Sequence, residues 1–223
     1  YFWENYLISK LKAIVIGATG ATGRELIKIL LLRSEVKHIL VFTRKKLDVS
    51  SPKLDVHVIN FAEIDKYRNI IKGDILFSAL GTTLKDAKSK TNQFEVDYTY
   101  QYNLAKISSE NNVKTLSLVS SSGANENSLF FYPKIKGLLE SSVKQLNFEN
   151  IQIYQPPFLI RQSDVMRSNE KIGIFIFKAL NSVGILNSLR PLPVAKLAEK
   201  MVNESLKKHP QRVMVFENKD ILD

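Results

Sequence analysis

The stretch IVIGATGATGREL, residues 14 to 26, joins an apolar run to an amphipathic segment through a glycine-rich turn. Its glycines stand at every third position, at Gly17, Gly20 and Gly23. The run over 13–16 predicts a buried strand, and apolar residues at helical spacing predict a helix over 21–32. A strand, a tight turn and a helix in direct succession are typical of the opening unit of a parallel α/β sheet. This stretch therefore restricts the possible folds strongly.

Strands and helices continue to alternate along the chain. Further apolar runs predict strands over 38–43, 56–59, 74–79, 115–119, 151–154 and 212–216. Amphipathic or apolar segments predict helices over 64–71, 91–111, 132–146, 172–180 and 194–206. Because the strands are mostly apolar throughout, we expect a doubly wound α/β fold with a parallel sheet covered on both faces. We expect a single domain over 1–223, with a nucleotide-binding core over 11–155 and a small substrate-side lobe plus the last strand over 156–223.

The composition excludes several classes of protein. With 44% hydrophobic and 24% charged residues among 223, the chain is typical of a globular domain. No apolar run approaches the roughly 18 residues of a membrane span, and we expect no membrane partner. A chain without cysteine has no disulfide, thiolate zinc site or cysteine nucleophile, and we expect a reducing, cytoplasmic location. The three histidines lie far apart in the sequence, so we expect no metal site.

The net charge of +10 is spread along the chain rather than concentrated in one segment. Its densest clusters, at 44–46 and 85–90, contain no aromatic residue that could stack on bases. Spread-out charge is typical of solvated faces, and we expect no nucleic-acid partner. A nucleic-acid-binding protein of this fold is the weakest alternative, and it predicts a steep salt dependence of RNA affinity.

The glycine turn has the features of a site for a pyrophosphate. Gly17 permits the tight turn, Gly20 permits a phosphate to approach the backbone, and Gly23 permits the helix to pack close to the strand. The helix N-terminus adds free N–H groups and the positive end of the helix dipole. The spacing is G-x-x-G-x-x-G rather than the more familiar G-x-G-x-x-G, so its place between a strand and a helix is what makes it informative.

The residues after the second predicted strand indicate which dinucleotide binds. Proteins that bind NAD usually carry an acidic residue there, about 20 residues after the glycines, which binds the ribose hydroxyls. This chain instead has Thr43 followed by Arg44, Lys45 and Lys46. Arginine can stack on adenine and form an ion pair with a 2′-phosphate. The alternative is a solvated basic turn, and we predict NADP(H) rather than NAD(H) as the cofactor.

Candidate catalytic residues follow the fifth predicted strand. That strand ends in three serines, Ser120 to Ser122, and the next helix opens with Tyr132 and, one turn later, Lys136. Residues four apart lie on the same face of a helix. An ammonium group beside a phenol lowers the pKa of the phenol, which can then act as general acid or base on a carbonyl or alcohol oxygen. A serine hydroxyl can hold that oxygen in place.

Four motifs in this order, GATGATG, SALGTT, VSSSGA and YPKIKG, resemble the short-chain dehydrogenase/reductase superfamily in its extended or atypical branch. They are similar to the Tat-interacting-protein-like oxidoreductases and their bacterial NAD(P)H-binding relatives, over roughly 11–218. The resemblance implies a Rossmann fold and hydride transfer between NADP(H) and a small carbonyl or alcohol substrate. It implies that Tyr132 transfers the proton, with Lys136 as its partner and Ser121, favoured by its place in SSxGA, as the third catalytic residue.

The resemblance also implies a set of cofactor-binding residues. Besides the glycines, Tyr132 and Lys136, these are Thr19, Ala21 and Thr22 at the phosphates, Arg44 and Lys45 at the 2′-phosphate, Asn60, Phe61, Leu80, Gly81 and Thr82 on the adenosine side, and Leu159 and Arg167 at the nicotinamide end. The family usually has Arg-Pro-Gly where this chain has Gln155-Pro156-Pro157, which alters the loop at the nicotinamide end. Asn60 replaces the family's usual Asp and can still bind adenine.

The sequence leaves the catalytic role, the assembly and the substrate open. One alternative to an enzyme is a regulatory or scaffold protein that binds NADPH and has only vestigial catalysis. A homodimer is possible, since the helices over 91–111 and 132–146 pair subunits in many relatives. The segments that would enclose a substrate, 125–131 and 162–190, show no pattern that identifies it.

Overall fold

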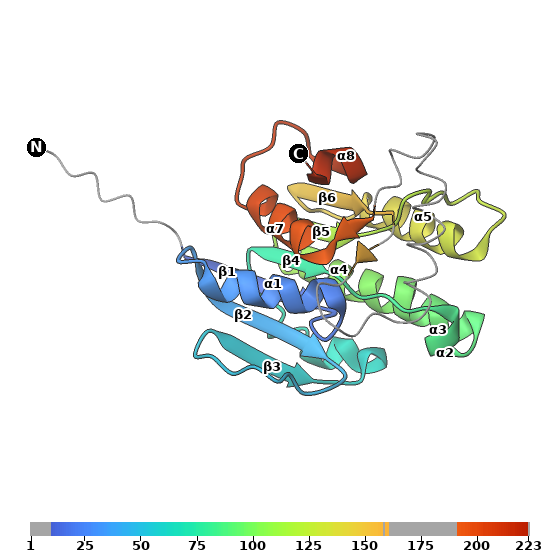
Figure 1. The fold of residues 1–223 in the computed structure, drawn as a ribbon. Helices are drawn as coiled ribbons and strands as arrows, with labels where there is room; N and C mark the ends of the chain where they lie inside the picture. The colour runs from blue at the N-terminus through green and yellow to red at the C-terminus, as the bar shows by residue number, and fades with distance from the viewer. Residues whose placement is uncertain (1–9, 158, 161–190, 223) are drawn as a thin grey trace, which may run out of the picture.

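A computed structural model describes residues 10–157, 159–160 and 191–222 of the chain (Figure 1). Within these residues a seven-stranded sheet has the order β3-β2-β1-β4-β5-β6-β9, and every neighbouring pair is parallel. Its strands are β1 (Leu11–Ile16), β2 (Val36–Thr43), β3 (Leu54–Val58), β4 (Ile75–Ser78), β5 (Thr115–Val119), β6 (Asn150–Gln155) and β9 (Val213–Glu217). The order reverses between β1 and β4, which confirms the predicted doubly wound fold.

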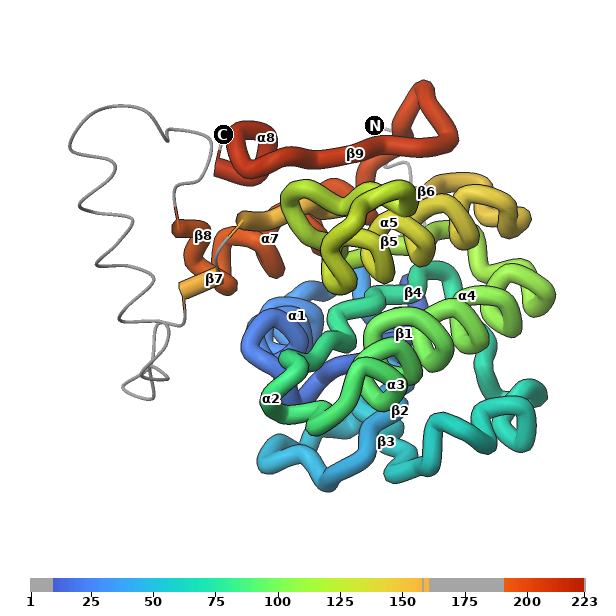
Figure 2. Tube along the Cα trace, turned by 90° about the vertical axis from the view of Figure 1, so that its right-hand side faces the viewer, coloured from blue at the N-terminus to red at the C-terminus, as the bar shows by residue number. Residues whose placement is uncertain are grey.

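Helices cover both faces of the sheet. One face carries α1 (Ala21–Leu32) and α7 (Val194–Ser205), which pack against each other. The other face carries η1 (Phe61–Tyr67), α4 (Tyr100–Glu110) and α5 (Phe131–Val143). In Figure 2, α1 and α4 lie on opposite sides of β1 and β4. The shorter helical segments are α2 (Leu84–Ala87), α3 (Lys90–Phe94), η2 (Glu95–Thr99) and α8 (Asn218–Leu222).

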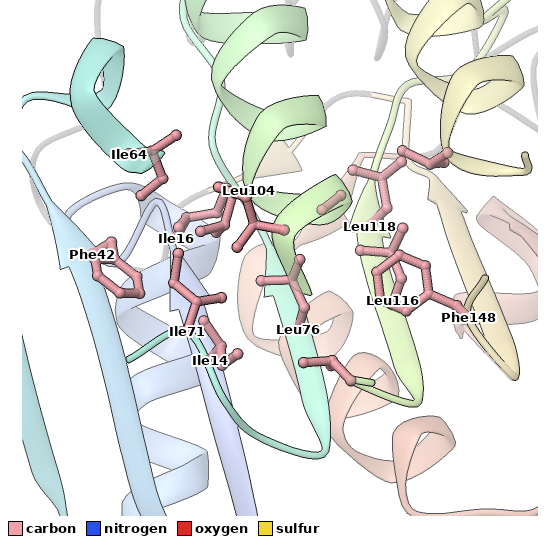
Figure 3. Packing of buried hydrophobic residues seen from close by; sticks show 14 of the residues in the cluster. Ile14, Ile16, Phe42, Ile64, Ile71, Leu76, Leu104, Leu116, Leu118 and Phe148 are labelled. Atoms are coloured by element: carbon pink, nitrogen blue, oxygen red, sulfur yellow. The ribbon is translucent and has the colours of Figure 1, made fainter. Parts of the chain in front are cut away.

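The core consists of two apolar clusters, one on each face of the sheet. On β1, Ile14 and Ile16 belong to the cluster under α4 and α5, which Figure 3 shows, whereas Ala13 and Val15 belong to the cluster under α1 and α7. All four side chains are at most 1% exposed. Full burial of a side chain such as Ile stabilises a fold by about 1.5–3 kcal/mol, so a strand that is apolar on both faces is firmly held at the centre.

Two predicted helices differ from the structure. The single helix expected over 91–111 consists of α3, a π-helical turn (η2) and α4. The weak helix expected over 64–71 is a 3-10 helix that begins at Phe61, where the Asn60 side chain caps it by accepting from Ala62 N–H at 3.1 Å. The helix predicted over 172–180 lies outside the described residues.

The C-terminal residues that the structure describes belong to the layers of the sheet. α7 packs on α1, and β9 pairs with β6 as the last strand. A separate two-stranded ladder joins β7 (Leu159–Ile160) to β8 (Leu192–Pro193). In this described part of the chain, no helix combines the length and the apolar character needed to cross a bilayer.

Candidate functional site

The glycine turn after β1 rests directly on the backbone that follows β4. Gly17 has a φ of +81°, and a Cβ atom there would lie 2.3 Å from the Ala79 carbonyl oxygen. A Cβ atom on Gly23 would lie 2.1 Å from the Gly17 carbonyl oxygen, so α1 can pack this close only without a side chain. α1 begins after Gly20, which offers no side chain to cap its first N–H groups. The turn therefore forms a tight backbone cradle at the carboxyl edge of the sheet.

The other residues predicted at the phosphates surround this cradle. Thr19 and Gly20 are exposed, Ala21 is half-buried and Thr22 is buried. The Thr19 carbonyl accepts a hydrogen bond from Arg24 Nε at 3.1 Å. The Gly20 N–H donates to the Gly17 carbonyl at 2.8 Å within the turn, and no side chain caps the first turn of α1 that follows. Gly20 is exposed, so an anion can approach the turn from solvent. These positions suit the pyrophosphate predicted from the sequence.

Arg44 and Lys45, the residues predicted at the 2′-phosphate, are both exposed at the end of β2. The Thr43 hydroxyl closes this turn by donating to the Lys45 carbonyl at 2.9 Å and accepting from Lys45 N–H at 3.3 Å. Two further cations, which sequence reasoning did not assign to the site, lie nearby. Arg24 and Lys46 line a cavity of about 230 Å³ whose wall also includes Ala18, Thr19, Ile27, Lys28, Leu31, Leu47, Asp48 and Val49.

Asn60 and Phe61 have structural roles. The Asn60 carboxamide is the cap of η1, and the Phe61 ring is only 2% exposed, stacked on Tyr100 with ring centroids 5.6 Å apart. A contact between Phe61 and a cofactor would therefore come from its backbone.

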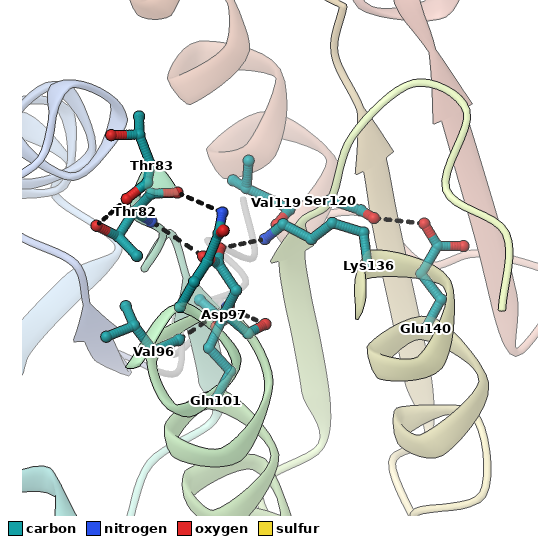
Figure 4. Close-up of polar contacts among 11 residues, drawn as sticks. Thr82, Thr83, Val96, Asp97, Gln101, Val119, Ser120, Lys136 and Glu140 are labelled. Carbon is teal, nitrogen blue, oxygen red and sulfur yellow. Dashed lines mark hydrogen bonds and ion pairs between the residues drawn. The ribbon is translucent and has the colours of Figure 1, made fainter. Parts of the chain in front are cut away.

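Lys136 is buried beside a carboxylate that the sequence did not identify. Its side chain is 3% exposed, and its Nζ lies 3.4 Å from Asp97 Oδ1 and 3.5 Å from the Val119 carbonyl oxygen (Figure 4). The other oxygen of Asp97 accepts from Thr82 N–H at 3.3 Å. Burial raises the pKa of the wholly buried Asp97 carboxyl, and the Lys136 ammonium offsets this only in part. The two residues thus form an ion pair within the protein, where a lone charge would be costly.

Tyr132 lies on the first turn of α5, and the structure brings it beside Lys136. Lys136 Nζ is 6.0 Å from the centroid of the Tyr132 ring, and the Tyr132 side of the pair is open, with 38% of the residue exposed. The four-residue spacing predicts that the two side chains face the same way, and the structure adds that Lys136 is buried and Tyr132 accessible.

The three serines after β5 are not equivalent. The Ser120 hydroxyl is buried and donates to the Glu140 carboxylate, which also accepts from Gln155 Nε2 at 2.9 Å and 3.1 Å. The Ser121 hydroxyl is partly exposed and donates to the Ser122 carbonyl at 3.3 Å. The Ser120 hydroxyl is therefore already hydrogen-bonded in the interior, whereas the Ser121 hydroxyl is accessible at the edge of the sheet. The same network gives Gln155, which stands in place of the family's Arg, a partner of its own.

At the predicted nicotinamide end, the structure describes one of the two residues. Leu159 is half-buried in β7 and packs against the cluster under α1 and α7. Arg167 lies outside the described residues. Leu80, Gly81 and Thr82 form the loop after β4, between the glycine turn and Asp97.

The chain is similar to a known protein family over more than half of its length. A family model described as NAD(P)H-binding matches residues 17–147. The chain belongs to this NAD(P)H-binding family. Among its relatives, Protein FMP52, mitochondrial, of Candida albicans is 34% identical over 155 residues, 67% of this chain and 68% of the relative. Protein HTATIP2 of Rattus norvegicus is 26% identical over 223 residues, 98% of this chain and 91% of the relative. The resemblance to atypical short-chain dehydrogenases/reductases is confirmed.

Solved structures of low sequence identity share the fold of this family member. The Bordetella bronchiseptica enzyme WbmG in complex with NAD has a TM-score of 0.71 at 14% identity, covering 94% of this chain and 73% of that one. dTDP-4-dehydrorhamnose reductase from Bacillus anthracis in complex with NADP has a TM-score of 0.64 at 19% identity, covering 94% and 75%. These likenesses support the Rossmann fold, and the family match supports a nicotinamide dinucleotide as the cofactor.

The expected cytoplasmic location is wrong by the same comparison. FMP52 proteins from Candida albicans, Meyerozyma guilliermondii, Scheffersomyces stipitis and Emericella nidulans all carry the word mitochondrial in their names. The expectation rested on the absence of cysteine. Cysteine content reports on redox conditions, and reducing conditions are not confined to one compartment.

Gly137 attaches the loop that carries the serines to α5. A Cβ atom there would lie 2.1 Å from Glu126 N and 2.2 Å from the Asn125 carbonyl carbon. We expect Gly137→Ala to displace the loop over 121–130 and to lower the free energy of unfolding by about 2–3 kcal/mol, measured by chemical denaturation. Gly123→Ala is the control, since it adds strain at a φ of +76° but meets no atom within 4 Å. Equal losses in the two variants would contradict this packing.

Proposed function

We propose that this protein is an NADP(H)-dependent oxidoreductase that transfers a hydride to or from a small carbonyl or alcohol substrate. A continuous series of contacts carries the proposal. The glycine turn touches the backbone after β4, the Gly81 Cα faces Asp97, Asp97 contacts Lys136, and Lys136 lies beside Tyr132. The predicted phosphate cradle and the predicted proton-transfer pair thus belong to one edge of the sheet, at the position where the strand order reverses.

The residues at this edge fit a phosphorylated dinucleotide. In this proposal the exposed turn at 19–20 and the uncapped N-terminus of α1 bind the pyrophosphate, and Lys136 donates to the hydroxyls of the nicotinamide ribose. Arg44 and Lys45 provide charge for a 2′-phosphate, and we add Arg24 and Lys46 because they line the adjoining cavity. When bound, the nicotinamide supplies hydride chemistry, and the protein supplies orientation and the proton.

Tyr132 is the proposed proton donor or acceptor. Its phenol is accessible to a substrate, and Lys136 Nζ lies 6.0 Å from the centroid of its ring. Ser121 is the proposed residue that holds the substrate oxygen, because the Ser120 hydroxyl already donates to Glu140.

The proposal is tested first by binding and then by turnover. We expect NADPH to bind more tightly than NADH in a titration followed by nucleotide fluorescence. A screen of aldehydes, ketones and quinones should then reveal oxidation of NADPH at 340 nm. A protein that binds neither nucleotide would refute the proposal.

The preference for NADPH depends on the cations after β2. We expect Arg44→Ala to weaken NADPH binding roughly 10–100-fold while NADH binding is unchanged, because only the 2′-phosphate loses a charged hydrogen-bond partner. Isothermal titration calorimetry measures both affinities. Lys208→Ala, which removes an exposed lysine beyond the end of α7, is the control. An equal loss for both nucleotides would place Arg44 at another part of the cofactor.

A regulatory protein that binds NADPH without turnover is the second candidate. It is favoured by the accessibility of Tyr132, 38% exposed, because a phenol at the surface can also contact a protein partner.

We also propose a mitochondrial location, from the names of the FMP52 relatives. Fractionation of cells that express the tagged chain tests it, and recovery outside mitochondria would contradict it.

A further inference from the structure

Asp97 connects two parts of the proposed cofactor site that come from distant parts of the sequence. One carboxylate oxygen accepts from Thr82 N–H in the loop after β4, at 3.3 Å. The other lies 3.4 Å from Lys136 Nζ on α5, and a Cβ atom on Gly81 would come within 3.3 Å of it. Asp97 is wholly buried. A carboxylate in this position can fix both the loop and the lysine.

The backbone around Asp97 supports this arrangement. Asp97 lies in the middle of the π-helical turn η2 between α3 and α4, and such turns occur frequently at functional sites. Gln101 Nε2 donates to the Asp97 carbonyl at 2.9 Å, and its Oε1 accepts from the Ser78 hydroxyl at 2.8 Å. Gln93 Nε2 donates to the Thr82 carbonyl at 3.4 Å. The N–H and the carbonyl of Thr82 therefore both hold the loop after β4 in place. Gln101 connects the backbone of Asp97 to Ser78 at the end of β4.

Lys136 depends on this carboxylate for its position. Among the residues that the structure describes, Asp97 is the one carboxylate within 4.0 Å of Lys136 Nζ. The nearest turn of α5 does offer Glu140, but that group is engaged with Ser120 and Gln155. Removal of one partner from a buried ion pair leaves an unpaired charge, which favours the neutral lysine or a shift of the side chain toward water.

We infer that Asp97 is a positioning residue for the nicotinamide half of the cofactor: it pairs with Lys136 and holds it in place against the loop that follows β4. The inference rests on the proposed function and adds to it a residue that acts through Lys136. It predicts that loss of the Asp97 charge affects the nicotinamide half of NADPH and spares the adenosine half.

The test uses Asp97→Asn, which keeps the size of the side chain and an oxygen that can accept from Thr82 N–H. We expect NADPH affinity to fall about tenfold or more, whereas adenosine 2′,5′-bisphosphate, which lacks the nicotinamide half, binds within twofold of the wild type. Asp65→Asn, a change at an exposed carboxylate paired with Arg68, is the control for loss of a negative charge. General damage to the fold would weaken both ligands, and that result, or an unchanged NADPH affinity, would overturn the inference.

A double-mutant cycle separates positioning from a merely structural role. Lys136→Met removes the residue through which Asp97 acts, so adding Asp97→Asn to it should cost no further NADPH affinity. It should also raise the melting temperature above that of Lys136→Met alone, because it removes the unpaired buried charge. Additive losses of affinity would overturn the inference and leave the proposed function intact. Wild-type protein that binds neither NADPH nor the bisphosphate would refute the proposed function and the inference together.

Discussion

We expect Gly23→Ala to lower the free energy of unfolding by about 3 kcal/mol or more and to abolish NADPH binding. The added methyl group would lie 2.1 Å from the Gly17 carbonyl oxygen, 2.6 Å from its carbon and 2.7 Å from Ala18 Cα. All three atoms belong to the backbone of the turn, so no side chain can rotate away. Either α1 moves off the sheet or the turn opens, and both changes destroy the cradle for the pyrophosphate.

Gly20→Ala is the matched control in the same turn. A methyl group there would lie 3.1 Å from the Gly17 carbonyl oxygen, and the backbone of Gly20 has a φ of −76°, which alanine adopts readily. We expect a stability loss of about 1 kcal/mol or less, with NADPH binding weakened because the methyl group stands where a phosphate would approach. Thermal unfolding and nucleotide titration of both variants measure these effects. A Gly23→Ala protein as stable as Gly20→Ala would contradict the close packing of α1.

The core of the fold could be predicted from the sequence because its strands and helices have strong local patterns. The helix over 21–32 and the strand over 115–119 have the predicted bounds, because each is strongly apolar and is bordered by glycine, serine or polar residues. The apolar pattern also specifies both faces of β1. Such local patterns determine the secondary structure, and the alternation of strands and helices then leaves few possible topologies.

The π-helical turn η2 could not be predicted in this way. One extra residue in a turn hardly changes the helical spacing of apolar residues over 91–111, so the segment was predicted as one regular helix. The contact between Asp97 and Lys136 joins residues that are far apart in the sequence, and only the packing of α5 beside α4 brings them together. The sequence does contain one clue to this contact, since Asp97 is a charged residue next to the apolar Val96 within the segment 91–111.

The serines illustrate a second limit. The sequence places three hydroxyl groups in succession after β5 but does not show which of them points inward. In the structure the buried Ser120 hydroxyl donates a hydrogen bond to Glu140, which lies one helical turn beyond Lys136 on α5. The partner of Ser120 is again supplied by tertiary packing. The pairing of Tyr132 with Lys136, in contrast, lies within one helix, and for that reason the four-residue spacing was sufficient to predict it.

We expect Tyr132→Phe to reduce turnover roughly 10²–10⁴-fold while the dissociation constant for NADPH changes less than about threefold. The substitution removes the hydroxyl that transfers the proton and keeps the ring that lies 6.0 Å from Lys136 Nζ. Turnover is followed as NADPH oxidation at 340 nm, with the carbonyl compound that the wild-type protein reduces fastest. Because cofactor contacts persist, the loss should appear in kcat rather than in nucleotide affinity.

Tyr102→Phe provides the matched control, since it makes the same chemical change on α4, where Tyr102 stacks on Tyr98 rather than facing Lys136. We expect its turnover to stay within about twofold of the wild type. If Tyr132→Phe retained full turnover, another group would have to supply the proton and the proposed role of Tyr132 would be wrong. If the wild-type protein bound NADPH tightly and reduced no compound of the screen, the regulatory alternative would be favoured, and the buried Asp97–Lys136 pair would then serve cofactor binding alone.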